Sequence, residues 1–311
     1  MPAFEGFADF DANKDVPSLK GKVILITGGT AGAGKASVEA LARHEPEHIY
    51  FTGRNTGAAE SLITELTAEY PELRLTFLRM DLSSLQDVKA AAARFAHDRL
   101  DILICNAGVL DVPPSLTVDG FQIVMATNHL GHAMLIRQLL PVLLRSAKTP
   151  EADVRIVMVS SAGYAFHPRE GINWEGIRSP RASLIDWATG YGQSKLANLV
   201  YASELARRYP EILSVSVHPG FVASDMVKNT HMLIRAGLYF MNTLQGIHAL
   251  PPGKGCLNQI WAAAGAKREA IMNGVYYTPI GVVGKLDKVA SSEEFARKLW
   301  TWTDELLDTA T

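Results

Sequence analysis

Hydrophobic positions along the chain form short β-branched or apolar runs that alternate with longer segments of helical periodicity. The runs predict strands, and the segments between them predict helices because apolar residues recur there every three or four positions. Such alternation is typical of right-handed βαβ units in a parallel sheet. The predicted strands are residues 23–27, 48–52, 74–78, 102–105, 155–160, 213–218 and 275–278, and the predicted helices include residues 36–43, 58–70, 85–97, 120–145 and 193–209.

This pattern continues from end to end, without an internal repeat or a low-complexity linker. We therefore predict an α/β single-domain Rossmann fold over residues 1–311, a doubly wound parallel sheet of about seven strands with helices on both faces. Residues 163–189 and about 222–252 fit no regular crossover, and long irregular segments in compact domains are often functional loops. We expect both to fold over a bulky apolar substrate. Their large apolar residues Trp174, Trp187, Met226 and Met232 are either pocket walls or plain core.

The hydrophobic content and the net charge of the chain indicate which kinds of partner it binds. Hydrophobic residues make up 48% of the 311 residues, and the net charge of -2 gives no basic footprint for nucleic acid or an anionic membrane, so a small-molecule substrate is expected. The first twenty residues lack a signal-peptide pattern, residues 232–250 are too polar to span a bilayer, and Cys105 lies in an apolar run as a buried thiol. A cytoplasmic location follows. The sequence leaves open whether the chain forms a homo-oligomer.

A glycine-rich turn follows the first predicted strand and leads directly into a helix. Its sequence is Thr27-Gly28-Gly29-Thr30-Ala31-Gly32-Ala33-Gly34. Glycines let the backbone approach a pyrophosphate, while free N–H groups at the helix start face the anion. An ordinary strand-to-helix turn is the alternative, and the flanking strand and helix favour a dinucleotide site with Gly28, Thr30, Gly32 and Gly34 in contact with it.

The end of the second strand indicates which dinucleotide binds. An acid there would accept the ribose 2′-hydroxyl of NAD(H). Gly53 and Arg54 stand in its place, so a 2′-phosphate is not repelled and Arg54 can attract it. We therefore expect NADP(H) as the cofactor, although a solvated loop arginine is the alternative.

Tyr191 and Lys195 lie four residues apart, on one helical face if the helix has begun by Tyr191. An adjacent cation, together with an oxidised nicotinamide, would lower the pKa of the phenol toward neutrality. Without other evidence, a tyrosine and a lysine at this spacing are usually an ordinary pair of side chains on the protein surface. The nine histidines offer only His129 and His132 at helical spacing, without an acidic or cysteine partner, so we expect no metal and assign both to helix packing.

Over nearly its whole length the chain resembles the classical short-chain dehydrogenases/reductases, with the Asn128 and Tyr191 stretches most similar to retinol-dehydrogenase-like members and their fungal relatives. The glycine spacing differs from that of the extended epimerase-like group. The resemblance implies catalytic roles for Asn128, Ser161, Tyr191 and Lys195, and cofactor contacts from Asp81, Leu82, Asn106, Ala107, Gly108, Tyr191, Lys195, Pro219, Gly220, Val222 and Ser224. Serine replaces the family's usual threonine at Ser224, and chemistry alone does not separate Ser160 from Ser161.

By this resemblance, Tyr191 passes a proton to a carbonyl oxygen as hydride arrives, and Ser161 hydrogen-bonds that oxygen. Lys195 lowers the pKa of the phenol and binds the nicotinamide ribose, while Asn128 orders a relay water. The expected function is a ketoreductase or alcohol dehydrogenase. A catalytically weak NADP(H)-binding redox-sensing regulator is the alternative, and such a protein would be expected to lack the tyrosine or the lysine.

Overall fold

The computed structural model describes residues 9–110, 113–150, 152–180, 184–222, 232 and 249–309. One sheet organises them, in the order β3-β2-β1-β4-β5-β6-β7-β8. Its strands are β1 (Val23–Ile26), β2 (His48–Gly53), β3 (Leu75–Arg79), β4 (Ile102–Cys105), β5 (Arg155–Val159), β6 (Leu213–Val217), β7 (Tyr276–Thr278) and β8 (Val282–Val283). All neighbours are parallel except β7 and β8, which pair as an antiparallel edge.

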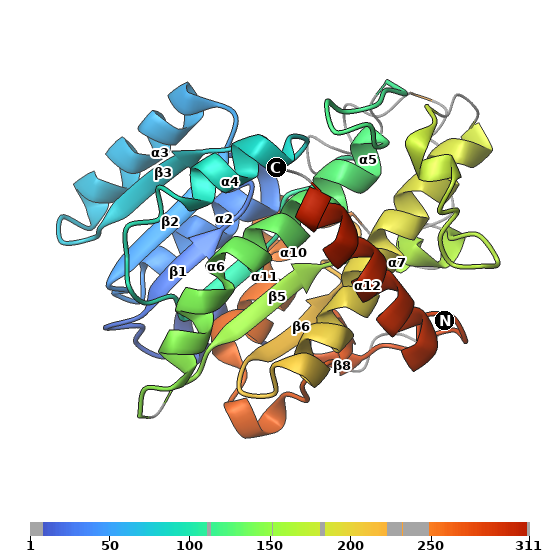
Figure 1. Cartoon of the computed structure of the whole chain (residues 1–311). Helices are drawn as coiled ribbons and strands as arrows, with labels where there is room; N and C mark the ends of the chain where they lie inside the picture. Colours follow the sequence, from blue (N-terminus) through green and yellow to red (C-terminus); the bar gives the residue numbers. More distant parts are fainter. Residues whose placement is uncertain are drawn as a thin grey trace.

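Side chains on alternate strand positions enter two separate cores, because successive residues of a strand point to opposite faces. On one face the sheet packs against α4 (Leu85–Ala92), α6 (Gly131–Ala147) and α7 (Leu184–Arg208), with α12 (Glu293–Thr309) lying on α7. The other face packs against α1 (Ala12–Asp15), α2 (Gly32–Ala42), α3 (Thr56–Glu69), α11 (Leu257–Ile260) and the π-helix η4 (Trp261–Gly265). The result is a three-layer α/β arrangement (Figure 1).

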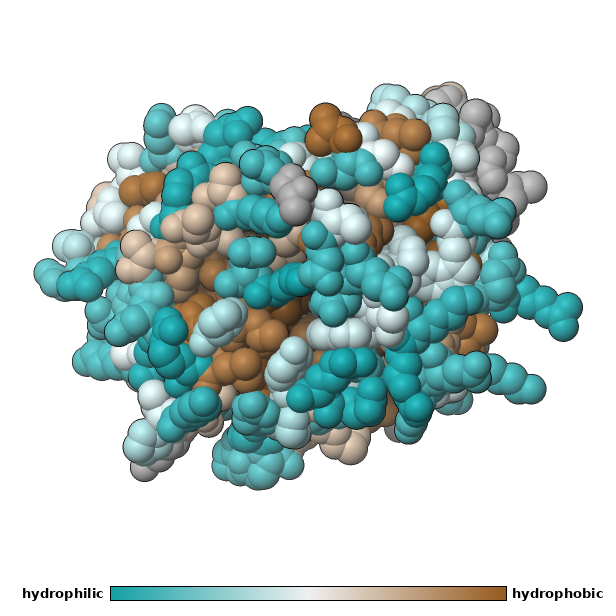
Figure 2. Space-filling view, in the orientation of Figure 1, coloured by the Kyte–Doolittle hydropathy of each residue, from teal (hydrophilic) through white to brown (hydrophobic). Residues whose placement is uncertain are grey.

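The strand order reverses between β1 and β4, since the chain passes from β1 to β2 and β3 and then returns to β4. In open α/β sheets, ligands bind at the carboxyl ends of the strands at such a switch point. Surface side chains on the viewed face are mostly hydrophilic, with apolar ones gathered near its middle over α6 and β5 (Figure 2).

All seven predicted strands are present to within a residue at most boundaries, and the additional strand is β8. The helix predicted over residues 120–145 is interrupted: α5 (Ile123–Met125) passes into the π-helix η1 (Ala126–Leu130) before α6 begins. Residues 163–189 are more regular than expected. They contain the 3-10 helices η2 (Ala162–Phe166) and η3 (Gly176–Arg178), and α7 starts at Leu184. A further short helix is α10 (Pro252–Gly255).

Candidate active site

The glycine turn between β1 and α2 places bare backbone at the start of a helix. Gly28 and Gly32 have φ of 69° and 56°, the left-handed region that favours glycine. A Cβ at Gly34 would lie 2.2 Å from the carbonyl oxygen of Gly28, so no side chain fits there. The first turn of α2 has neither a side-chain cap nor an acidic residue. This loop can therefore receive an anion on free N–H groups.

The segment after β4 is tied to that loop by hydrogen bonds. The backbone N–H groups of Asn106 and Ala107 donate to the Thr27 hydroxyl oxygen at 2.9 and 3.0 Å, and the Asn106 side chain donates to the Thr27 carbonyl at 2.9 Å. A Cβ at Gly108 would lie 3.1 Å from Oδ1 of Asn128 and 3.4 Å from Nζ of Lys195. Residues 106–108 thus lie between the glycine loop and two of the predicted catalytic side chains.

Gly53 ends β2 beside the same loop. A Cβ added there would lie 2.7 Å from Oγ1 and 3.0 Å from Cγ2 of Thr30, so the Thr30 side chain fills the space that an acidic residue would need. Arg54 follows as an exposed side chain, and within the described part of the chain its guanidinium has no ion-pair or hydrogen-bond partner. The arginine is therefore free to meet an anion at this edge.

Asp81 and Leu82 follow β3. The Asp81 carboxylate accepts from the backbone and hydroxyl of Ser83 at 2.9 and 2.7 Å, which orders the turn. A Cβ at Gly131 would lie 2.4 Å from the carbonyl oxygen of Leu82, so α6 packs directly against this turn.

Asn128 lies in η1, fully buried, with its amide held from both sides. Its Oδ1 accepts from the Val109 N–H at 2.7 Å, and its Nδ2 donates to the Val109 carbonyl at 2.9 Å and to Oγ of Ser194 at 3.0 Å. The Ser194 hydroxyl in turn donates to the Tyr191 carbonyl at 2.8 Å. The amide of Asn128 thus connects the segment after β4 to the turn of α7 that carries Tyr191. Single-turn π-helices are frequent at functional sites.

The two serines after β5 have different surroundings. The Ser160 hydroxyl is buried and donates to the Lys195 carbonyl at 2.7 Å, so it secures α7. The Ser161 side chain accepts from the Gly163 N–H at 3.0 Å, and its hydroxyl acts on the Tyr191 phenol to lower the pKa of that phenol. Geometry therefore favours Ser161 over Ser160 as the residue that acts beside the tyrosine.

Tyr191 and Lys195 share one face of α7, which has already begun at Leu184. Nζ of Lys195 lies 5.8 Å from the centroid of the Tyr191 ring and donates to the Val159 carbonyl at 3.0 Å. The ring edge of Tyr191 packs on Gly163, where a Cβ would lie 3.1 Å from Cε1. Four predicted catalytic residues, Asn128, Ser161, Tyr191 and Lys195, thus converge where the ends of β4 and β5 meet α7.

Burial dominates the electrostatics of this group. It lowers the pKa of Lys195 to about 8, because the charged ammonium loses its hydration. The pKa of the Tyr191 phenol is raised by burial, and the Ser161 hydrogen bond offsets only part of that. In the chain by itself the phenol is therefore neutral. The expected lowering of its pKa, which also requires the charge of an oxidised nicotinamide, stays a prediction. A neutral phenol is the form that can donate a proton.

The residues after β6 lie at the same edge of the sheet as those after β4 and β5. Gly220 has φ of 86°, and Val222 packs against Gly255, where a Cβ would lie 2.4 Å from Cγ2 of the valine. Pro219 precedes this turn. Ser224 lies outside the described residues, as do Met226 and most of the expected substrate segment at residues 222–252.

Of the two interpretations of Trp174, pocket wall or core, the structure supports packing against the core. Its ring packs on Trp302 and Phe295 of α12, at centroid distances of 5.1 and 6.2 Å, and Lys298 lies over it. The tryptophan is core beneath α12. Sequence reasoning also missed two supporting residues: Thr27, whose motif position was a signal, and Gln259, which donates to Oδ1 of Asn106 at 3.1 Å and gave none.

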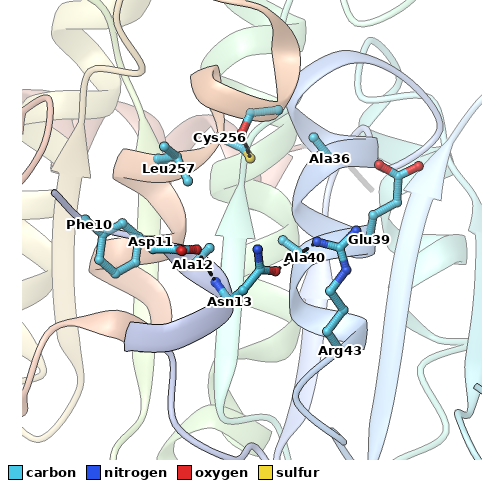
Figure 3. A pocket seen from close by; sticks show the side chains of 11 residues that line it. Phe10, Asp11, Ala12, Asn13, Ala36, Glu39, Ala40, Arg43, Cys256 and Leu257 are labelled. Atoms are coloured by element: carbon cyan, nitrogen blue, oxygen red, sulfur yellow. Dashed lines mark hydrogen bonds between the residues drawn. The ribbon is translucent and has the colours of Figure 1, made fainter. Parts of the chain in front are cut away.

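One pocket, of about 270 Å³, lies elsewhere (Figure 3). It is lined from α1, α2 and α10, and Arg43 donates to Asn13 across it at 2.9 Å. The residues that line this pocket do not include the four predicted catalytic residues Asn128, Ser161, Tyr191 and Lys195. Among the residues that the structure describes, no three His, Cys, Asp or Glu side chains form a cluster able to hold a metal. Nor does any helix in the described ranges have the length and apolarity that crossing a bilayer requires.

Known proteins are similar to this chain in sequence and in fold. The family model "short chain dehydrogenase" matches residues 22–171. The "Short-chain dehydrogenase/reductase drtF" of Aspergillus calidoustus is 36% identical over 308 residues, covering 94% of this chain and 95% of the relative. A crystal structure of an uncharacterized protein from Mycobacterium Paratuberculosis superposes with a TM-score of 0.71 at 27% identity, over 96% and 97% of the two chains. The Pseudomonas aeruginosa RhlG/NADP active-site complex has a TM-score of 0.63 at 26% identity, over 85% of this chain and 96% of that one.

Proposed function

Because the chain belongs to the short-chain dehydrogenase/reductase family of oxidoreductases, we propose that it exchanges a hydride between NADP(H) and a carbonyl or secondary alcohol carbon of a bulky apolar substrate. The observation that carries this proposal is that Tyr191 and Ser161 meet beside Gly163, with Lys195 on the same face of α7 as Tyr191. We further propose that residues 1–311 act as one dinucleotide-binding domain, which the continuous sheet supports. The free buried thiols of Cys105 and Cys256 support a reducing compartment, so cytosol is the location that we propose.

The residues at the switch point fit a dinucleotide phosphate. Gly28, Gly32 and Gly34 keep the loop free of side chains, and the uncapped start of α2 would hold the pyrophosphate. Arg54 would hold the 2′-phosphate, because it is exposed and unpaired among the described residues, and Thr30 blocks the space of the acid that NAD(H) favours. The RhlG neighbour, whose structure is an NADP complex, supports the same choice.

When bound, the nicotinamide supplies or accepts the hydride. The chain's own residues control the proton and the charge. The neutral Tyr191 phenol donates a proton to the substrate oxygen in reduction and takes it back in oxidation. The Ser161 hydroxyl, which lies with that phenol beside Gly163, stabilises the negative charge that develops on the same oxygen. The Lys195 ammonium, held by the Val159 carbonyl, stabilises the phenolate left behind.

Specificity is proposed to come from segments that close over this group. Of the described residues, η2 is the best placed to contribute, because its end packs against α7 at Gly192, where a Cβ would lie 2.7 Å from the carbonyl carbon of Phe166. Phe166 itself is half exposed. An apolar side chain at this rim suits a bulky apolar substrate.

The test is oxidation of NADPH by the purified chain with a panel of ketones, quinones, retinoid aldehydes and steroids. We expect turnover with at least one bulky apolar carbonyl compound, and a large loss in the Tyr191→Phe variant. Tight NADPH binding without turnover on any member, in either direction, would favour the redox-sensing regulator instead.

A further inference from the structure

His132, in the first turn of α6, lies fully buried between the cofactor side and the catalytic side of the site. Its Nε2 is 2.8 Å from Oγ1 of Thr27 at the end of β1, and its Nδ1 is 3.0 Å from the backbone carbonyl oxygen of Asn128. The imidazole therefore bridges the residue that braces Asn106 and the π-helical turn that carries Asn128.

The partners of His132 determine where its proton lies. A carbonyl oxygen can only accept, so Nδ1 must carry the hydrogen that points at Asn128. The Thr27 oxygen already accepts from the N–H groups of Asn106 and Ala107, which occupies both of its lone pairs. Its own hydrogen must then go to an acceptor. The His132 Nε2 at 2.8 Å is a better one than the Ile104 carbonyl at 3.5 Å.

These donors and acceptors require a neutral His132 imidazole with its hydrogen on Nδ1. A protonated ring would direct a third donor at the Thr27 oxygen. The surroundings agree, because burial lowers the pKa of His132 to about 4, and the Lys195 charge acts in the same direction against the hydrogen bond to Asn128.

We propose that His132 is a positioning residue that couples dinucleotide binding to the alignment of the catalytic group. On one side it fixes the Thr27 hydroxyl, which holds Asn106 and Ala107 against the glycine loop. On the other side it holds the backbone of Asn128, whose amide leads through Ser194 to the Tyr191 turn. This inference rests on the proposed function for its kinetic consequences, whereas the tautomer does not depend on that function.

Three replacements of His132 separate its two contacts. His132→Leu removes both, and we expect the Kd for NADPH to rise and kcat to fall by about 10-fold each, since buried partners lose their hydrogen bonds. His132→Gln can place an acceptor near Thr27, so it should restore the Kd more than kcat. His132→Asn can place an amide N–H near the Asn128 carbonyl, so it should restore kcat more than the Kd. A structural role alone would not divide the two parameters in this way.

Ser146→Ala is the matched control. Ser146 is also buried in α6 and accepts from the Leu100 N–H at 2.8 Å, but it lies at the far end of the helix. Its loss should lower the melting temperature and leave the Kd and kcat within about twofold of wild type. Thr27→Val should raise the Kd alone, because it also removes the acceptor of the Asn106 and Ala107 N–H groups. Combined with His132→Leu, it should raise the Kd by less than the product of the two single effects, because both changes break the contact between Thr27 and His132.

The tautomer is measured directly by ¹⁵N–¹H correlation spectra of the imidazole in the wild-type chain at pH 7. We expect the neutral form with hydrogen on Nδ1. Hydrogen on Nε2, or a charged ring, would overturn the inference whatever the enzyme does, and so would equal effects of His132→Leu and Ser146→Ala on the Kd and kcat. Absence of NADPH binding by the wild type would instead contradict the proposed function.

Discussion

Replacing Gly53 and Arg54 at the end of β2, together with Thr30 of the glycine loop, should reverse the cofactor preference, and the structure shows why changing Gly53 and Arg54 alone is not enough. Gly53→Asp would introduce the carboxylate that binds the ribose hydroxyls of NAD(H). Its Cβ, however, would lie 2.7 and 3.0 Å from Oγ1 and Cγ2 of Thr30. Thr30→Ala removes both atoms and leaves the Thr30 Cβ at 3.4 Å, an ordinary contact. The combination Thr30→Ala, Gly53→Asp and Arg54→Ala is therefore the variant to make.

The expected ratio of NADPH affinity to NADH affinity follows from the contact between Arg54 and the 2′-phosphate. A hydrogen bond to a charged group contributes about 1.5 to 3 kcal/mol, which is roughly 10-fold to 150-fold in affinity. Arg54 is exposed, so solvent and salt screen its charge and the lower end applies. We expect wild type to bind NADPH about 10-fold more tightly than NADH, Arg54→Ala to bind both about equally, and the triple variant to favour NADH.

Dissociation constants for both dinucleotides, measured by fluorescence titration at two salt concentrations, test this reasoning. Thr30→Ala alone is the control and should keep the NADPH preference. Gly53→Asp with Arg54→Ala should bind both dinucleotides poorly. Equal affinities in the wild type, or tighter binding of NADH, would refute the assignment of Arg54 and Gly53.

Three further outcomes are expected. Gly34→Ala should raise the Kd for NADPH at least about 10-fold, because its Cβ would meet the Gly28 carbonyl oxygen at 2.2 Å, whereas Gly57→Ala in α3, with 3.7 Å to its nearest neighbour, should leave that Kd unchanged. Since the pKa of Lys195 is about 8, its ammonium loses a proton as pH rises through 8, so kcat/KM should fall there; Lys195→Arg, which stays charged, should show no such fall. Burial lowers the pKa of His129 to about 3, so the unfolded chain gains a proton below pH 6.5 that the folded chain does not, and stability should decline from pH 6.5 toward 4. His129→Gln should make that decline shallower by up to about 1.4 kcal/mol per pH unit in urea titrations, and an unchanged slope would contradict the assignment.

Local signals were enough to predict the sheet and the residues that its edge presents. β1 and β4 are continuous apolar runs, and so is β5 after Arg155, because both faces of the sheet are covered. The residues after β1, β4 and β5 then fall at one edge of a parallel sheet. Tyr191 and Lys195 were expected on one helical face, and they are.

Features that depend on distant partners could not be predicted in the same way. Trp174 belongs to the core because α12 covers it, and nothing near Trp174 in the sequence specifies that helix. The start of α7 was hidden by Gly190 and Gly192, poor helix formers, of which Gly192 is needed where η2 packs closely. His132 was rightly expected to pack within its helix, but its bridging contacts need the positions of Thr27 and Asn128 in space.

Single-turnover hydride transfer in Tyr191→Phe tests the central claim most directly. The substitution removes only the phenolic oxygen that Ser161 contacts, so the Kd for NADPH should stay within about twofold of wild type. The rate of NADPH oxidation with a carbonyl substrate should fall at least about 100-fold, the lower end for general acid catalysis. A rate like that of the wild type, with NADPH binding intact, would contradict the claim that this tyrosine delivers the proton.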